Sequence, residues 1–173
     1  MDLKKYIQTV EDYPKKGIMF RDITPLIENR YAFNYVIKEF IKFGRELDVD
    51  YVVGPEARGF IFGAPVAYGL KKGFSLVRKP NKLPRETVDV EYDLEYGSNV
   101  LSMHKDSLPK GCKVLIVDDL LATGGTALAA CKLCEKLGCK VMGLCFVIDL
   151  VDLKGKELLK DYNVKTLVEY EGE

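Results

Sequence analysis

The stretch VLIVDDLLATGGT, residues 114–126, sets two acidic residues between an apolar run and a glycine-rich turn. The run KVLIVD (113–118) is β-branched and apolar on both faces, which is typical of a central strand in a parallel sheet. Ligands of such sheets bind beyond the carboxyl ends of the strands, where Asp118 and Asp119 fall. The stretch therefore predicts both a fold class and the place of a ligand site.

The glycine-rich turn has the composition of an anion cradle. Glycines let backbone amides approach an anion closely, and the start of the following helix adds a favourable dipole. The carboxylates beside it are suited to accept hydrogen bonds from a neutral group such as vicinal sugar hydroxyls, and a divalent cation could share the site. A phosphate joined to a diol is a ribose 5-phosphate, which we predict as the ligand. The predicted phosphate loop consists of Ala122, Thr123, Gly124, Gly125 and Thr126.

Helical and strand periodicities alternate along the rest of the chain. Helices are expected at 31–47, from the mid-50s to about 68, and at about 124–137, with strands at 51–54, 75–79 and 140–149 and a final short helix and strand. This order predicts an open, mostly parallel, twisted α/β sheet flanked by helices on both faces. The segment ETVDVEYDLEYGSNVLSMH (86–104) instead alternates like an antiparallel hairpin that turns near residues 95–97. We expect residues 80–104 to form an inserted, flexible lid.

Composition limits the classes of protein that remain. A chain of 173 residues favours a single domain, and its formal net charge of zero points to neither nucleic acid nor an anionic membrane as a partner. No apolar run approaches the roughly 20 residues that span a bilayer. Five cysteines, an odd number, favour reduced thiols. We therefore expect a cytoplasmic protein.

The strand, the two acids and the sequence ATGGT resemble the phosphoribosyl-pyrophosphate signature of the type I phosphoribosyltransferases. Three further segments resemble the branch of that family that acts on adenine: GIMFRDITPL (17–26), VGPEARGFIFG (53–63) and VRKPNKLPRETVDVEYDLEYG (77–97). The resemblance implies one phosphoribosyltransferase domain over 1–173, with residues 1–30 contributing to a hood over the base. It also implies formation of AMP and pyrophosphate from adenine and 5-phospho-α-D-ribose 1-diphosphate (PRPP), and a homodimer.

The resemblance assigns roles to individual residues. It implies that pyrophosphate is bound by Glu56, Ala57, Arg58, Arg78, Lys79 and Lys82, and the base by Met19, Phe20, Arg21 and Leu120. It also implies an unusual peptide geometry near Glu56–Ala57. The alternative for Arg58 is a solvated surface arginine, and the alternative for Phe20 is a plain core aromatic. Mg²⁺ is expected as a cofactor held by PRPP and water, with no direct protein ligand.

Three acidic residues are the predicted catalytic groups. Asp118 and Asp119, under the ribose, would stabilise the positive charge that develops on the sugar as pyrophosphate leaves. Glu95 resembles the family's lid carboxylate, which accepts a hydrogen bond from the base and acts as general base. The alternative for Glu95 is a solvated turn glutamate, because EYG also suits a turn.

Three other classes of protein share part of this sequence pattern. A transferase for 6-oxopurines such as hypoxanthine is the second enzyme hypothesis, because some relatives that share FRDITPL prefer that base. A PRPP-sensing regulatory protein is a more distant alternative, and it would normally carry an added helix-turn-helix segment and a basic patch. A receiver domain also has paired acids at a strand end, but it lacks a glycine-rich phosphate loop directly after them.

Overall fold

A computed structural model describes residues 1–93 and 97–172 of the chain. In these residues five parallel strands form the central sheet, in the order β4-β3-β7-β8-β9. The strands are β3 (Tyr51–Pro55), β4 (Gly73–Val77), β7 (Lys113–Leu121), β8 (Lys140–Leu150) and β9 (Val164–Tyr170). The predicted parallel sheet is confirmed, with the quoted stretch at its centre.

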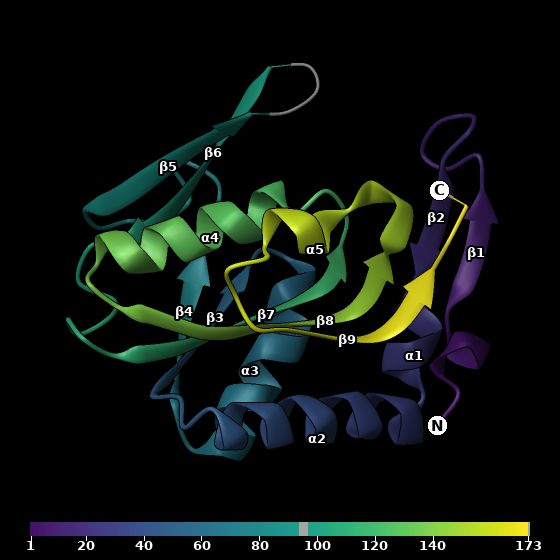
Figure 1. Cartoon of the computed structure of the whole chain (residues 1–173), viewed down its shortest axis with the longest axis horizontal. Coiled ribbons are helices and arrows are strands. Elements are labelled where there is room, and N and C mark those ends of the chain that lie inside the picture. The colour runs from purple at the N-terminus through teal and green to yellow at the C-terminus, as the bar shows by residue number, and fades with distance from the viewer. Residues whose placement is uncertain (94–96, 173) are drawn as a thin grey trace.

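Helices cover both faces of the sheet (Figure 1). On one face lie α2 (Arg30–Glu46) and α3 (Arg58–Leu70), and on the other lie α4 (Gly125–Lys136) and the short α5 (Gly155–Leu158). Each face has its own apolar cluster, with Phe40 and Phe62 in one and Leu133 in the other. Burial on both faces explains why the strands are apolar throughout rather than alternating.

Local sequence signals account for where the longest helix begins. The side chain of Asn29 accepts hydrogen bonds from the backbone N–H groups of Tyr31 (3.0 Å) and Ala32 (3.1 Å), which is a typical N-cap. Buried residues then recur at helical spacing, including Ala32, Val36 and Phe40. The predicted helix at 31–47 is therefore present, shifted by one residue.

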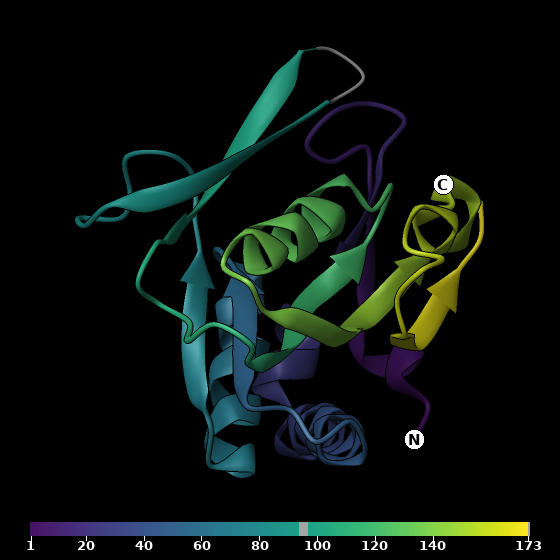
Figure 2. The same cartoon turned by 60° about the vertical axis from the view of Figure 1, so that its left-hand side comes forward.

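Antiparallel hairpins stand outside the central sheet. The predicted hairpin is formed by β5 (Thr87–Asp93) and β6 (Ser98–His104), paired from Thr87↔His104 to Asp93↔Ser98. A second hairpin is formed by β1 (Gln8–Glu11) and β2 (Met19–Asp22), where the sequence had not predicted strands. Both rise beyond the end of the sheet at which the parallel strands finish (Figure 2). They therefore stand on either side of the edge where a ligand is expected.

The remaining elements are short. They are the 3-10 helices η1 (Leu3–Tyr6) and η2 (Val151–Leu153) and the helix α1 (Thr24–Glu28). Among the described residues, no helix has both the length and the apolar composition that crossing a membrane requires.

Candidate active site

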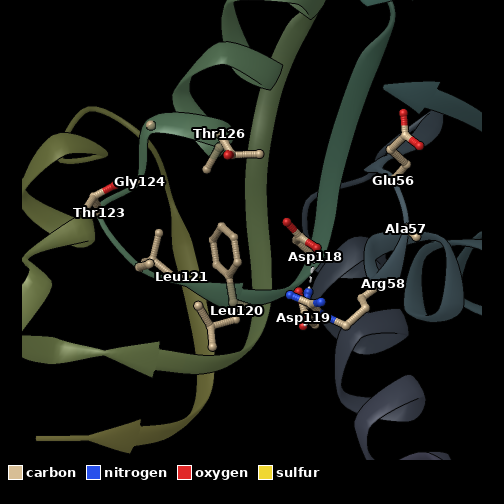
Figure 3. A pocket seen from close by; sticks show the side chains of 14 residues that line it. Glu56, Ala57, Arg58, Asp118, Asp119, Leu120, Leu121, Thr123, Gly124 and Thr126 are labelled. Atoms are coloured by element: carbon tan, nitrogen blue, oxygen red, sulfur yellow. Dashed lines mark hydrogen bonds and ion pairs between the residues drawn. The ribbon is translucent and has the colours of Figure 1, made fainter. Parts of the chain in front are cut away.

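The carboxyl ends of three neighbouring strands create the site. Strand β7 pairs with β3 on one side and β8 on the other, so the segments that follow these strands meet at one edge. A cavity of about 270 Å³ opens there (Figure 3). Predicted residues that line it are Glu56, Ala57, Arg58, Asp118, Asp119, Ala122, Thr123, Gly124, Gly125 and Thr126. Residues predicted from two separate segments, 56–58 and 118–126, are thus brought together.

A second cavity of about 330 Å³ adjoins the first and shares Arg58, Asp119 and Leu120 with it. All four residues predicted to bind the base line this second cavity: Met19, Phe20, Arg21 and Leu120. Sequence reasoning missed Leu150 and Leu153, which also line it. The available signal was their position at the end of β8 and just beyond it, because β8 is the parallel neighbour of β7 and such strands end at the same edge.

The phosphate loop follows a strand that is longer than predicted. Strand β7 runs to Leu121 rather than Asp118, since it stays paired with β8 through Leu121↔Asp149. Both acids therefore belong to the strand itself. Gly124 then turns the chain with a φ of +89°, a conformation that favours glycine, and α4 begins at Gly125. The start of a helix is therefore presented to the cavity.

The two carboxylates differ in their surroundings. Asp119 is 5% exposed, and its Oδ2 accepts a hydrogen bond of 2.5 Å from Nε of Arg58. The Oδ1 atom of Asp118 accepts a hydrogen bond of 2.8 Å from the N–H of Asp119. Burial, and then the negative charge of Asp119, raises the pKa of Asp118 well above its ordinary value. Arg58 thus stabilises a negative charge on Asp119, whereas burial disfavours one on Asp118.

The loop after β3 is fixed by ionic contacts. Glu56 accepts hydrogen bonds from the N–H of Lys79 (2.6 Å) and from Nη2 of Arg78 (3.3 Å). Burial alone would raise the pKa of Glu56, but these two donors outweigh it and the pKa is lowered. The peptide bond Glu56–Ala57 is cis, as the sequence led us to expect. Glu56 therefore acts on this loop as an anchor.

The other basic residues expected to bind pyrophosphate lie around that anchor. Arg78 also donates to the backbone oxygen of Lys82 (3.2 Å), so its guanidinium organises the 78–82 segment. Arg78, Lys79 and Lys82 are not among the residues that line the first cavity. Their contact with pyrophosphate stays a prediction.

The base cavity presents one aromatic ring and much backbone. Phe20 is partly exposed and meets the ring of Tyr13 edge-on at 5.1 Å between centroids, so it is not a core aromatic. The guanidinium of Arg21 lies 4.2 Å from the ring centroid of Tyr170 and donates to Thr9 Oγ1 at 2.7 Å. The side chain of Arg21 is thus engaged with Tyr170 and Thr9, while the residue lines the cavity. Glu95, the predicted general base, lies outside the described residues.

Comparison with known proteins agrees with this geometry. The model of the phosphoribosyl transferase domain matches residues 27–172. The chain belongs to the phosphoribosyltransferase family.

Solved structures of adenine phosphoribosyltransferases are similar over nearly the whole chain. The protein from Thermoanaerobacter pseudethanolicus is 48% identical, with a TM-score of 0.94 and coverage of 98% of both chains. The Rhodothermus marinus protein is 41% identical, with a TM-score of 0.92 and coverage of 97% of this chain and 96% of that one. The Saccharomyces cerevisiae protein is 39% identical, with a TM-score of 0.91 and coverage of 96% and 97%. The predicted branch of the family is confirmed.

Proposed function

We propose that this chain transfers the phosphoribosyl group of PRPP to N9 of adenine, forming AMP and pyrophosphate. The adjoining cavities that share Arg58, Asp119 and Leu120 support this best. One offers an anion cradle beside carboxylates, and the other offers apolar side chains beside the backbone of β2. A nucleotide divides in the same way, into a phosphate and sugar end and a flat base. The similar Saccharomyces cerevisiae enzyme was solved with adenine and an imino-altritol bisphosphate.

The phosphate loop would anchor the 5-phosphate. Backbone N–H groups of residues 123–126 and the start of α4 favour an anion. Gly124 is buried and Thr123 is exposed, so the loop offers a hydroxyl next to a close backbone surface. Because the 5-phosphate does not react, this anchor serves to hold C1 of the sugar at a fixed place.

The carboxylates of β7 would act on the sugar. Asp119 carries a negative charge stabilised by Arg58, and that charge favours the cationic sugar that forms as the C1–O bond to pyrophosphate breaks. Arg58 is half-exposed, and only its Nε is engaged with Asp119. The remaining guanidinium N–H groups are suited to the departing diphosphate. Arg58 thus links the sugar and leaving-group ends of the site.

Mg²⁺ is proposed as the cofactor. Asp118 and Asp119 line the same cavity, and Mg²⁺ beside them would take its oxygen ligands from PRPP and water. The site therefore fits an ion that arrives with PRPP. Bound there, it would neutralise charge on the leaving diphosphate.

Glu95 would accept a hydrogen bond from the imidazole ring of adenine and make N9 more nucleophilic. This role stays a prediction, tested by Glu95→Ala and Glu95→Gln. Both variants should lower kcat strongly while PRPP affinity is retained, because the amide cannot take up the proton. Near-parent turnover by Glu95→Ala at saturating adenine would contradict the role of general base and favour the alternative, a solvated turn glutamate.

The hairpins would enclose the reaction. We propose that residues 1–30 form the hood over the base and that residues 80–104 form the lid. Supporting contacts are those of Met19, Phe20 and Arg21 with the base cavity and the 3.2 Å hydrogen bond between the hydroxyls of Tyr92 and Thr126. Excluding water matters here because water would otherwise trap the activated sugar.

A cytoplasmic homodimer is proposed as the working form. The described cysteines are all free and buried, which suits a reducing compartment. Tyr31 and Tyr68, on α2 and α3, are 61% and 87% exposed, which offers apolar surface for contact between subunits. Light scattering at micromolar protein should give twice the chain mass, and a monomer mass would contradict the dimer.

The function is tested by assaying AMP formation from PRPP with adenine, hypoxanthine or guanine in parallel, with and without Mg²⁺. We expect adenine to give the highest kcat/KM by at least about 100-fold, because a site built to hydrogen-bond one base edge leaves buried polar groups unpaired with another. Comparable turnover of hypoxanthine would favour the 6-oxopurine alternative. No nucleotide product from any base would overturn the proposal.

A further inference from the structure

The segment that follows β8 serves both halves of the site. Leu153 of this segment and Leu150, the last residue of β8, line the base cavity, and the chain then continues into α5, which lies beside α4 (Figure 1). None of the charged residues of this segment lines either of the two cavities. What fixes this segment in place therefore also fixes the walls of the site.

Gly155 brings the segment directly against the phosphate loop. A Cβ atom at Gly155 would lie 2.4 Å from the backbone oxygen of Ala122 and 2.8 Å from the side chain of Leu121. In return, a Cβ atom at Gly124 would lie 3.0 Å from the backbone oxygen of Gly155. The two backbones touch without intervening side chains, so a displacement of α5 would be transmitted to the loop.

Lys156, the next residue, ties this contact to the sheet. Its Nζ lies 2.7 Å from Oδ2 of Asp149 and 2.9 Å from Oε1 of Glu169. Asp149 is 2% exposed and is the strand partner of both Leu121 and Glu169. The ammonium therefore joins α5 to the ends of β8 and β9, next to the residue from which the phosphate loop departs.

The environment keeps Lys156 charged. Partial burial lowers the pKa of Lys156, but hydrogen bonds with Asp149 and Glu169 raise it by more. A buried carboxylate such as Asp149 is costly without its cation, so the pair resists separation. In the pair of Lys105 with Glu86, whose atoms lie 3.0 Å apart, both partners are exposed. The Lys156 pair differs in having a buried anion and a backbone contact with the site.

We propose that Lys156, paired with buried Asp149, is a positioning residue for the 5-phosphate loop and acts through the contact of Gly155 with Ala122 and Gly124. The proposal rests on the proposed function for its kinetic readout. It does not require Lys156 to touch substrate. It predicts that loss of the pair loosens the loop, weakens PRPP binding and leaves the chemistry of the bound substrate largely intact.

The test compares Lys156→Met, Lys156→Arg and the double variant Asp149→Asn/Lys156→Met with the parent. Amide hydrogen exchange of the unliganded protein is measured over residues 121–126, and the KM for PRPP is measured at saturating adenine. Lys156→Met should speed exchange in the loop and raise the KM for PRPP by at least about tenfold, as small misplacements of a binding group do. Lys156→Arg should restore most of both properties. Lys105→Met, in the exposed pair, should change neither.

The double variant separates positioning from stability. It leaves no unpaired buried carboxylate, so its Tm should recover towards that of the parent, while the loop still exchanges fast and the KM for PRPP stays raised. It also decides the matter if Lys156→Met does not fold. Parent-like exchange and KM in the double variant would overturn the proposal. If the parent made no AMP at all, the proposed function would fail, whereas the exchange data would still judge the positioning role.

Discussion

Two loops of the site are proposed to bind anions, yet they are held in different ways. The loop after β3 is fixed by charged side chains: Glu56 is bound by Lys79 and Arg78, and Arg58 is bound by Asp119. The loop after β7 is fixed by backbone packing, with Gly124 against Gly155. Ionic contacts hold the first loop, and close approach of main chains holds the second.

The difference follows from what each loop is proposed to bind. The diphosphate is the leaving group, and its charge must be met by cations that can follow it as the bond breaks. The 5-phosphate keeps its charge and place throughout, so neutral amides in a rigid cradle are sufficient. Its binding energy serves to orient the sugar, which requires stiffness more than charge. The following predictions test this division.

The largest effect is expected from Asp119→Asn. The variant removes the charge that favours the cationic sugar, and we expect kcat to fall by about 10²–10³-fold, as for other preorganised electrostatic groups. Its Tm should change much less, since Arg58 is half-exposed and can be solvated. The matched control is Asp106→Asn, which breaks an exposed pair with Arg85 and should keep parent turnover. Near-normal kcat in Asp119→Asn would contradict the ribose assignment.

A smaller but specific effect is expected from Gly124→Ala. Its Cβ would press on the backbone oxygen of Gly155 in a left-handed conformation, so AMP affinity measured by calorimetry should fall by about tenfold or more. Gly111→Ala is the control, because Gly111 has a similar φ of +85° with open space around it. It should lose stability from backbone strain and keep its AMP affinity. If Gly124→Ala and Gly111→Ala lost AMP affinity equally, the loop after β7 would have no special role in binding AMP.

The sequence predicted this site well where the chemistry is local. The paired acids and the glycine-rich turn lie together within residues 114–126, and the structure places both at one cavity. Placing Arg58 and Phe20 in one site required the family resemblance. Arg58 and Asp119 are 61 positions apart in the chain, and their spacing in the sequence alone does not predict that they are in contact.

What the sequence did not predict depends on tertiary contacts. The pairing of Arg58 with Asp119 requires the neighbouring positions of β3 and β7, and the base-cavity leucines after β8 require the strand order. The β1–β2 hairpin was missed because its strands are only four residues long, with β1 largely exposed and β2 only partly buried, so they carry little apolar alternation. Likewise β7 was predicted three residues short, because pairing with β8 carries the strand through its own acids.

A still smaller effect, on pyrophosphate binding, is expected from Glu56→Gln. The amide oxygen can still accept from Lys79, but attraction to Arg78 is lost and the loop after β3 loosens. Pyrophosphate affinity should fall by about threefold, in the range of a weakened charge-assisted hydrogen bond, while AMP affinity stays unchanged. Asp48→Asn is the control and should alter neither affinity, because exposed Asp48 pairs with Lys113 at the start of β7, away from the site. A matching loss of AMP affinity would show that the two loops are not held independently.

The smallest effect is a gain in stability, expected from Asp118→Asn. The pKa of Asp118 is raised in the folded protein, so between its unfolded value of about 3.9 and its folded value the native state binds more protons than the unfolded state. Wild-type stability therefore falls as pH rises through that interval and stays lowered above it. The asparagine keeps an oxygen for the N–H of Asp119 and carries no charge, so it escapes this loss.

Scanning calorimetry of Asp118→Asn and the parent should thus give a Tm difference that favours the variant at pH 8 and shrinks as the pH is lowered. A gain of about 2–4 °C at pH 8 is expected, which corresponds to about 1 kcal/mol in a domain of this size. Asp106→Asn is the control. A hydrogen bond with Arg85 lowers the pKa of Asp106, so removing this exposed carboxyl should not raise the Tm. Turnover of Asp118→Asn should still fall, since stability is given up at this position for a carboxylate that faces the ribose. A variant that is less stable than the parent at pH 8 would mean that Asp118 is held as a satisfied anion, and the contrast drawn between the two acids would then be wrong.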